Sequence, residues 1–523
     1  MRPLTRTAGI GYEEKGSHPP GTSRTRSHQI RPLVTAQTTD NAVSMPHNAI
    51  QRGKTRLSDH SLRQGALGLL DTAVMAVAGS APAYSITAST AALVAAVGIA
   101  GPAALSIAFV PMIGITIAFS YLNLWRSDAG AAYAWVGRAL HPGLGFIAGW
   151  SLLSLSTIFM VAAALPAGEA TLDLIAPGQL HDVLWVTSIG AAWFLGVLAL
   201  VTCGITATAK VQVVLTLLEV GALILVGGLA IWHARITPVT AFSWNWFFPS
   251  AFGSFDSFTA GMLVAIFYFF GWDVSSNLAE ETANAKKAAG LGGVVGVLVI
   301  VALFLLLQVA VQMVLTSDQI QANAANLLPA LGHVALGAPW SAVAILAVMV
   351  SAVATLQTQL LQCTRLLFSM ARDRVIGEPM GWLHPRFQTP WLAGLTIACV
   401  SLLLFATSAT VPSVNQLMSD LINAIGVQVS FYYALAGIAC VWYYRLVIFT
   451  GWKMLVFAGI VPLTSALFVA SVGLYQLPQL GFRVSVMSIG TILIGIAPLC
   501  YYRRLYNSRF YTDPPESARR TDA

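Results

Sequence analysis

Two apolar stretches of this chain are interrupted by residues that a straight helix does not favour. Residues 79–85 read Gly-Ser-Ala-Pro-Ala-Tyr-Ser, and residues 269–273 read Phe-Phe-Gly-Trp-Asp. An interrupted helix inside a bilayer exposes backbone N–H and C=O groups, which can bind an ion or the charged ends of a small solute. Two interruptions in corresponding halves of a chain therefore indicate the binding site of a secondary transporter.

In the first interruption, Pro82 lacks a backbone N–H and disfavours a helical conformation at Ala81. The half-helix that restarts here would present free N–H groups and the positive end of its dipole to an anionic group such as a carboxylate. We expect the backbone of Ser80, Ala81 and Ala83 to contact the solute, with the hydroxyl groups of Ser80 and Ser85 nearby. The alternative is a proline kink in an ordinary membrane helix.

In the second interruption, the carbonyl groups of Phe269 and Phe270 could accept hydrogen bonds from an ammonium group, and Gly271 lets the backbone approach closely. Trp272 is a candidate gate that stacks over the site, although packing in the core or against lipid is the alternative for each aromatic residue. Asp273 is an acid within or near the bilayer, where a charge is costly unless it is used. It could contact a substrate amine, but we favour capping of the restarted helix and gating.

Glu219 is a second acid, placed deep in an apolar stretch nine residues after Lys210. On a helix this separation is about 13 Å. Glu219 could alternate between protonated and ionised forms or balance a cationic solute; alternatively, it snorkels or pairs with Gln357 or Gln359. Gln357 and Tyr433 are further candidates for coupling or gating. Hydrogen bonding between helices is the alternative for Gln357, and packing is the alternative for Tyr433.

The composition indicates that these residues lie in a membrane protein. The 523 residues are 56% hydrophobic and 9% charged, with a mean hydropathy of +0.73, whereas soluble domains carry roughly 25% charged residues. The cysteines are scattered without metal-ligand spacing, so we expect no metal and no cofactor. The basic residues lie in loops and tails, which argues against nucleic acid as a partner. Membrane spans are predicted at residues 66–97, 103–124, 143–166, 183–203, 209–232, 254–279, 290–315, 340–368, 391–410, 415–442, 453–474 and 484–502.

Charge sets the predicted orientation. All but two of the 28 Lys and Arg residues lie in the first 63 residues, in alternate connections or near the C-terminal end; the exceptions are Arg235 and Arg483. The positive-inside rule then places both termini in the cytoplasm, with Glu169 and Asp318 outside. Three regions are expected: a disordered basic cytoplasmic tail at 1–60, a transmembrane domain at 61–505 and a cytoplasmic C-terminal tail at 506–523.

Several sequence motifs resemble those of the amino acid–polyamine–organocation permease superfamily. They lie at residues 128–133 with 145–150, 279–287, 365–373 and 384–390, and the resemblance covers most of residues 61–505. It implies an all-α membrane protein of about twelve helices: two inverted five-helix repeats, as in leucine-transporter-like proteins, and two extra helices. The first and sixth helices are then the broken ones. Glu219 falls where proton-coupled relatives carry a lysine, and Ala285 stands where the family usually has proline.

The resemblance implies a secondary active transporter that imports an amino acid, a polyamine or a related small amine across the bacterial inner membrane by alternating access. Proton coupling is the favoured form, so protons and the lipid bilayer are expected partners beside the substrate. An amino acid exchanger is the alternative within this class. A membrane sensor without transport is the alternative from another class, although the predicted tails are too short for a signalling domain. No cluster of acids, bases or metal-binding groups indicates an enzyme.

Overall fold

The computed structural model describes residues 61–179, 182–324, 326–408, 414–513 and 516. The predicted tail at residues 1–60 lies outside these ranges. The chain divides into two units, and every described residue belongs to the second, Asp59–Ala523. Within the described ranges the regular elements are helices, beside an isolated β-bridge between Leu67 and Thr282. The prediction of an all-α protein is therefore confirmed.

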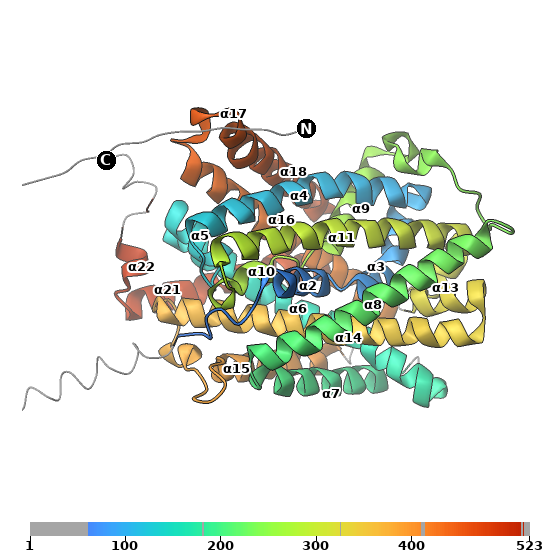
Figure 1. Ribbon diagram of the computed structural model, residues 1–523, viewed down its shortest axis with the longest axis horizontal. Coiled ribbons are helices and arrows are strands. Elements are labelled where there is room, and N and C mark those ends of the chain that lie inside the picture. Colours follow the sequence, from blue (N-terminus) through green and yellow to red (C-terminus); the bar gives the residue numbers. More distant parts are fainter. Residues whose placement is uncertain (1–60, 180–181, 325, 409–413, 514–515, 517–523) are drawn as a thin grey trace, which may run out of the picture. The chain divides into compact units, whose positions relative to one another are not determined.

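The longer helices lie side by side, roughly parallel or antiparallel to one another (Figure 1). In the described part of the chain, nine helical stretches are long and apolar enough to cross a membrane. Every predicted span overlaps a helix or a broken helix. In chain order these are α2 (Leu69–Gly79) with α3 (Pro82–Val97), α4 (Gly101–Trp125), α6 (Pro142–Ile175), α7 (Val183–Thr202), α8 (Ile205–Ala234), α9 (Phe255–Tyr268) with α10 (Val274–Asn277), α11 (Ala285–Val314), α14 (Ala338–Arg372), α15 (Trp391–Ser408), α16 (Val414–Tyr444), α18 (Val461–Gln476) and α21 (Ile496–Leu505). Shorter helices in the connections include α5 (Ala132–Ala139), α12 (Ser317–Ala322) and α13 (Leu327–Leu336).

The first membrane helix is broken where the sequence predicts it. α2 ends at Gly79 and α3 begins at Pro82, because the first turn of a helix tolerates a missing N–H. Between them, Ala81 has a φ of 46°, a left-handed conformation that alanine adopts only when the surrounding structure imposes it. α3 therefore starts a new series of helical hydrogen bonds, and the N–H groups of its first turn need partners from elsewhere.

The sixth membrane helix is broken at Gly271, which has a φ of 104°. The two breaks touch backbone to backbone at this residue and at Gly79. A Cβ atom added to Gly79 would lie 2.2 Å from the carbonyl oxygen of Gly271, and one added to Gly271 would lie 2.1 Å from the carbonyl oxygen of Gly79. Any side chain at either position would push the two segments apart, so the pair of glycines allows the breaks to meet.

Helix α11 packs closely against the half-helix α2. A Cβ atom added to Gly296 of α11 would lie 2.5 Å from Cβ of Ala76, and one added to Gly292 would lie 2.5 Å from Oγ1 of Thr72. Small residues at such contacts are typical of membrane bundles, where close packing replaces the hydrophobic effect as the source of association. α11 therefore fixes the position of the segment that leads into the first break.

One predicted span ends too early. The prediction ended the third span at residue 166, but α6 continues through Pro166 to Ile175. Membrane helices tolerate proline because neighbouring groups can satisfy the freed carbonyl. Glu169 was predicted to lie in an external connection; it is instead part of α6 and only 7% exposed. Asp318 lies exposed on the short helix α12.

Candidate functional site

Glu219 is the acid that reaches the first break. Its Oε1 atom accepts a hydrogen bond of 3.0 Å from the backbone N–H of Ala83, in the first turn of α3. The side chain projects from the middle of α8 and is fully buried. Free N–H groups and the helix dipole both favour a carboxylate at the start of a helix. A single hydrogen bond to a titratable group therefore ties α8 to the point where α3 restarts.

α14 binds the same break on both of its sides. Oγ of Ser351 accepts a hydrogen bond of 3.1 Å from the N–H of Tyr84, the residue after Ala83. One turn further along α14, Oγ1 of Thr355 donates to the carbonyl oxygen of Gly79 at 3.1 Å. α14 thus satisfies a donor after the break and an acceptor before it, which breaking the helix would otherwise leave unpaired.

Most of the groups predicted to bind a solute at this break already have partners within the protein. The hydroxyl of Ser85 donates to the carbonyl oxygen of Ser80 at 2.8 Å. The N–H of Ala81 donates to the carbonyl oxygen of Ala78 at 3.1 Å, and that of Ala83 donates to the acid on α8. The hydroxyl of Ser80 is buried and has no partner among the described residues. Of these predicted groups, it is the one best able to bind a solute directly.

Asp273 follows the second break and is fully buried. Its Oδ1 accepts a hydrogen bond of 2.9 Å from the hydroxyl of Tyr433, and its Oδ2 accepts bonds of 3.2 Å from the hydroxyl of Tyr432 and 2.7 Å from Nε2 of Gln362. These donors replace the water that a carboxylate loses on burial. The side chain does not cap α10, so the predicted capping role is wrong. Asp273 instead joins the second break to α14 and α16, and Tyr433, a predicted gating residue, is one of its partners.

Aromatic rings surround both breaks. Phe159 of α6 lies between Tyr84 and Phe270, and its ring centroid is 5.5 Å from the first ring and 5.4 Å from the second, both edge-on. Trp272 packs edge-on against Phe119 of α4 with 5.0 Å between centroids. All five rings are buried. They make the surroundings of the breaks apolar, which strengthens each polar interaction there.

Two further predicted residues contact other parts of the bundle. The ring of Phe269 packs edge-on against Phe304 of α11, with 5.6 Å between centroids. Nε2 of Gln357 donates to the carbonyl oxygen of Thr208 at 2.9 Å and so joins α14 to α8. Gln357 therefore forms a hydrogen bond between helices, which was the alternative to a role in coupling or gating.

The face of α14 that contacts the breaks was not recognised in the sequence. It carries Ser351, Thr355 and Gln362, and successive members are separated by four and seven residues, the spacing of one helical face. The sequence analysis instead singled out Gln357 and Gln359 of the same helix. Helical periodicity of Ser, Thr and Gln in this apolar stretch was the signal that could have found them.

Several buried polar atoms on the helices that meet at the breaks have no partner within the described structure. Buried polar groups are normally hydrogen-bonded, so a group of unpaired ones marks a place that can bind a polar molecule. They include the hydroxyl groups of Ser80 and Tyr84, Nε1 of Trp272, Oε2 of Glu219 and the side-chain amide of Gln359. This set contains both donors and acceptors, as a solute with an ammonium and a carboxylate group requires.

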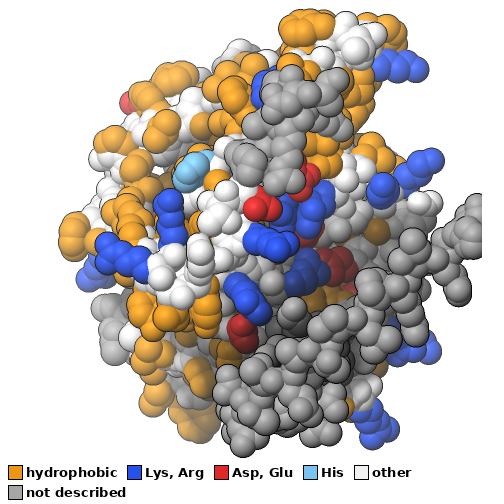
Figure 2. Space-filling view, turned by 90° about the vertical axis from the view of Figure 1, so that its left-hand side faces the viewer, with side chains coloured by type: hydrophobic (Ala, Val, Ile, Leu, Met, Phe, Trp, Pro, Cys, Tyr) orange, Lys and Arg blue, Asp and Glu red, His pale blue; other side chains and the backbone are white. Residues whose placement is uncertain are grey.

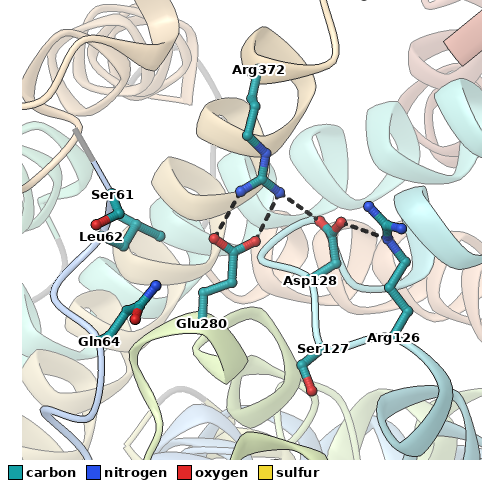
Figure 3. Close-up of a pocket in the computed structure, with 8 residues that line it drawn as sticks. All are labelled: Ser61, Leu62, Gln64, Arg126, Ser127, Asp128, Glu280 and Arg372. Carbon is teal, nitrogen blue, oxygen red and sulfur yellow. Dashed lines mark hydrogen bonds and ion pairs between the residues drawn. The ribbon is translucent and has the colours of Figure 1, made fainter. Parts of the chain in front are cut away.

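A group of charged side chains lies at one end of the bundle, which we name the charged end after Arg126, Asp128, Glu280 and Arg372. Figure 2 shows basic and acidic side chains near the middle of this face, with hydrophobic side chains around them. Arg372 binds both carboxylate oxygens of Glu280 at 2.8 Å and Oδ1 of Asp128 at 3.3 Å, while Arg126 binds Asp128 at 3.0 Å. These four residues line a cavity of about 310 Å³ together with Ser61, Leu62, Gln64 and Ser127 (Figure 3).

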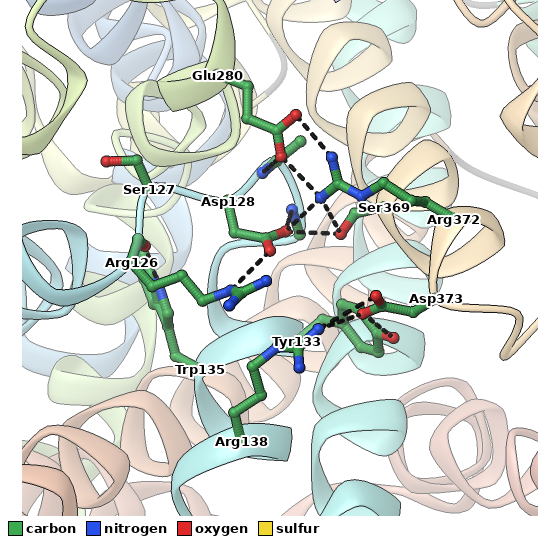
Figure 4. Close-up of polar contacts among 12 residues, drawn as sticks. Arg126, Ser127, Asp128, Tyr133, Trp135, Arg138, Glu280, Ser369, Arg372 and Asp373 are labelled. Atoms are coloured by element: carbon green, nitrogen blue, oxygen red, sulfur yellow. Dashed lines mark hydrogen bonds and ion pairs between the residues drawn. The ribbon is translucent and has the colours of Figure 1, made fainter. Parts of the chain in front are cut away.

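The ion pairs at the charged end keep Asp128 ionised. Burial alone would raise the pKa of Asp128, but the nearby guanidinium groups of Arg372 and Arg126 outweigh it, helped by hydrogen bonds from Ser369 and the N–H of Gly130. The pKa of Asp128 is therefore held below its usual range, and Figure 4 shows how its carboxylate lies between the two arginines. The loop after α4 is thus fastened to the end of α14 at neutral pH.

The segments before α2 and after α10 are also fastened together near this end. The N–H of Leu67 donates to the carbonyl oxygen of Glu281 at 3.0 Å, and the carbonyl oxygen of Leu67 accepts from the N–H of Ala283 at 2.8 Å. The carboxylate of Glu281 forms a fully buried ion pair with Arg365 of α14, with distances of 2.9 and 3.0 Å. Leu67 is only 1% exposed. The bundle is therefore closed at its charged end.

Sequence comparisons agree with this architecture. The profile of the amino acid permease family matches residues 67–497. A branched-chain amino acid permease of Lactococcus lactis is 26% identical over 60% of this chain and 70% of its own length, and a methylthioribose transporter of Bacillus subtilis is 28% identical over 59% and 68%. A serine/threonine exchanger of Bacillus subtilis is 24% identical over 26% of this chain and 32% of its own length. The chain therefore belongs to the amino acid permease family, within the amino acid–polyamine–organocation superfamily, and is a membrane transporter rather than an enzyme.

Proposed function

We propose that this permease imports an amino acid or a related small amine across the bacterial plasma membrane by alternating access, driven by protons that bind to Glu219. The observation that carries the proposal is the hydrogen bond of 3.0 Å between Oε1 of Glu219 and the N–H of Ala83. It connects a titratable group directly to one of the two breaks. The unpaired donors and acceptors around the breaks, which include the hydroxyl of Ser80, support binding of a polar solute there.

Protonation of Glu219 would change how firmly α3 is held. A hydrogen bond to an ionised carboxylate is roughly twice as strong as one to a neutral group. When Glu219 is ionised, the start of α3 is bound tightly to α8; when it is protonated, the bond weakens and a buried charge disappears. Proton binding from outside therefore favours movement of α3 relative to α8, and proton release restores the bond.

We infer that the charged end faces the cytoplasm. Arg126, Arg138 and Arg372 gather there, and the positive-inside rule assigns such an end to the cytoplasmic side. With this end closed, the solute would reach the breaks from outside. Its release inward requires the segment at Leu67 to separate from the segment at Glu281, because their backbones are hydrogen-bonded to each other.

Exchange of one amino acid for another is the second candidate. The relative named as a serine/threonine exchanger favours it, and an exchange cycle needs no change in the protonation of Glu219. The names of the other relatives extend from branched-chain amino acids to methylthioribose. Methylthioribose is a sugar derivative without an amino group, so these names do not agree on one substrate class. The match to the amino acid permease family is what supports an amino acid or a related small amine.

Uptake into proteoliposomes tests the proposal. Thermal-shift screening of the purified protein against amino acids, polyamines and small amines first identifies a ligand, because binding to the folded state raises its apparent stability. With the membrane potential held at zero, the wild-type protein should accumulate this ligand only when the outside is more acidic than the lumen. Accumulation that needs no pH gradient but requires a counter-substrate inside would instead support the exchanger.

Glu219→Gln tests the proton site. This variant keeps the shape of the side chain but cannot ionise, so it should lose gradient-driven accumulation and retain downhill exchange. Glu169→Gln is the matched control, because Glu169 is another buried carboxyl group on a membrane helix. It should retain accumulation. Equal accumulation by Glu219→Gln and the wild-type protein would exclude Glu219 as the proton carrier.

A further inference from the structure

The chain folds back onto the charged end after its last membrane helix. The C-terminal strap, which we define as residues 508–513 together with Glu516, contains the short helix α22 (Arg509–Thr512). Figure 1 shows α22 at the same end of the bundle as α5 and α21. The strap belongs to the region predicted as a cytoplasmic tail, and nothing in the proposed transport site uses it. Its contacts with three separate elements indicate a role of its own.

Phe510 anchors the strap in a fitted site. It is 7% exposed, and its ring stacks on that of Tyr133 with 4.9 Å between centroids and 19° between planes. The guanidinium of Arg138 lies over the ring of Phe510, 5.6 Å from the centroid of that ring. A Cβ atom added to Gly137 would lie 2.4 Å from Cζ of Phe510, so the glycine leaves room for the ring. α5 therefore presents an aromatic, a cation and a gap that together accommodate Phe510.

Polar contacts connect the strap to the end of α14. The hydroxyl of Ser508 donates to the carbonyl oxygen of Asp373. The carboxylate of Asp373 accepts hydrogen bonds of 3.1 Å from the hydroxyl of Tyr133 and from Arg138, the same two residues that hold Phe510 (Figure 4). Asp373 directly follows Arg372, which closes the charged end. The strap and the ion pairs of the charged end therefore share one short piece of backbone.

The far end of the strap reaches α4. Oε2 of Glu516 accepts a hydrogen bond of 3.3 Å from Nε1 of Trp125, and Oε1 lies 3.6 Å from the guanidinium of Arg126. Arg126 also binds Asp128, at 3.0 Å. The strap thus bridges the end of α4, the whole of α5 and the end of α14. The ion pairs of the charged end also join the first and the last of these, through Asp128 and Arg372.

We propose that the C-terminal strap is a built-in brake that holds the charged end closed, and that its release speeds opening at this end. This proposal depends on the proposed function in one respect: the charged end must open to release the solute. Seating Phe510 adds buried apolar area and ordered contacts to the closed arrangement. Separation of α4 from α14 would break the contacts that the strap makes with one of them, so an intact strap slows that separation.

Reactivity of a cysteine placed at Leu67 measures the opening. Leu67 is buried and forms its hydrogen bonds through its backbone, which a cysteine retains. The exposed Cys203, Cys399 and Cys500 are first replaced by alanine to remove background labelling. Purified protein in nanodiscs is then treated with a maleimide, and the labelling rate is followed by mass spectrometry.

Phe510→Ala should raise the labelling rate of the Leu67→Cys protein at least about tenfold, which corresponds to a change of ~1.4 kcal/mol in the opening equilibrium. Thr512→Ala is the matched control, because Thr512 is an exposed residue of the same helix. A chain that ends at Tyr506 lacks the strap altogether and should label as fast as Phe510→Ala.

Labelling at the parent rate in both Phe510→Ala and the shortened chain would overturn the proposal. Thermal unfolding of each variant shows whether it is folded. Faster labelling by a variant that has lost its unfolding transition would result from global unfolding and not from opening of the charged end, so it would count against the brake as well. The labelling result does not depend on transport. Faster labelling in a protein that shows no uptake would support the brake and refute the proposed function. Normal uptake with unchanged labelling would support the proposed function and refute the brake.

Discussion

Gly271→Ala should prevent the two breaks from meeting. A Cβ atom at this position would lie 2.1 Å from the carbonyl oxygen of Gly79, whereas ordinary contacts begin at 3.4 Å. The segments would therefore have to separate by more than about 1 Å, which costs ~1–3 kcal/mol in a close-packed interior. The φ of 104° adds a second cost, because it is strained for any residue with a side chain, again by ~1–3 kcal/mol.

Together these terms disfavour the arrangement with touching breaks by about 2 to 6 kcal/mol. Even the lower value reduces the population of this arrangement about 30-fold. Initial rates of uptake into proteoliposomes should fall by at least this factor, while the amount of protein in the membrane stays similar. The thermal unfolding midpoint should fall as well, because the contact is lost in the folded state only.

Two alanine variants separate the causes. Gly79→Ala meets the carbonyl oxygen of Gly271 at 2.2 Å without a positive φ of its own, so it tests the steric cost alone. Gly221→Ala in α8 is the control, because no atom lies within 4 Å of an added Cβ there. It should leave uptake unchanged. An uptake rate and unfolding midpoint of Gly271→Ala equal to those of Gly221→Ala would refute the contact between the breaks.

Three further predictions concern other parts of the molecule. Tyr433→Phe removes a donor to the buried carboxylate of Asp273; such a loss costs ~1.5–3 kcal/mol, so initial uptake should fall at least about tenfold, and an unchanged rate would argue against a role in gating. The pKa of Asp128 is lowered, so its contribution to the closed end is complete above its ordinary pKa of about 4 and is lost only as the pH falls through the lowered value. Maleimide reacts with the thiolate, so each labelling rate is divided by that of a free thiol at the same pH. This corrected rate for a Leu67→Cys protein should show no effect of Asp128 between about pH 5 and 8, and a corrected rate that rises as the pH falls within that range would contradict this assignment. With the proposed orientation, a membrane-impermeant maleimide should label Asp318→Cys in intact cells, whereas labelling only after permeabilisation would reverse the topology.

The positions of the breaks could be predicted because local chemistry determines them. Pro82 cannot continue a helix from α2, and Gly271 alone can adopt the conformation found at the second break. Glu219 was recognisable for a similar reason, since an acid in an apolar stretch is visible without any knowledge of its neighbours. The sequence therefore predicted the twelve spans and the two breaks, and it singled out Glu219, although not the contact of Glu219 with the first break.

The partners of these residues could not be predicted. Asp273 and Tyr433 are 160 residues apart in the chain, and Tyr84 and Ser351 are 267 apart. Which turn of one helix faces which turn of another depends on how side chains pack along both, and periodicity gives only the face. The capping role expected for Asp273 followed from its place at a helix start. In the structure, tyrosine and glutamine side chains from α16 and α14 donate to its carboxylate instead.

The acid on α8 has an electrical consequence for the proposed cycle. With a proton on Glu219 and a zwitterionic solute bound, the loaded carrier moves inward without adding charge. The empty carrier returns with Glu219 ionised, so a negative charge moves outward. An inside-negative membrane potential assists that step, by ~2.3 kcal/mol for a full elementary charge across 100 mV. A lysine in this position would carry its charge in the protonated, loaded carrier. Glutamate therefore transfers the voltage dependence to the return of the empty carrier.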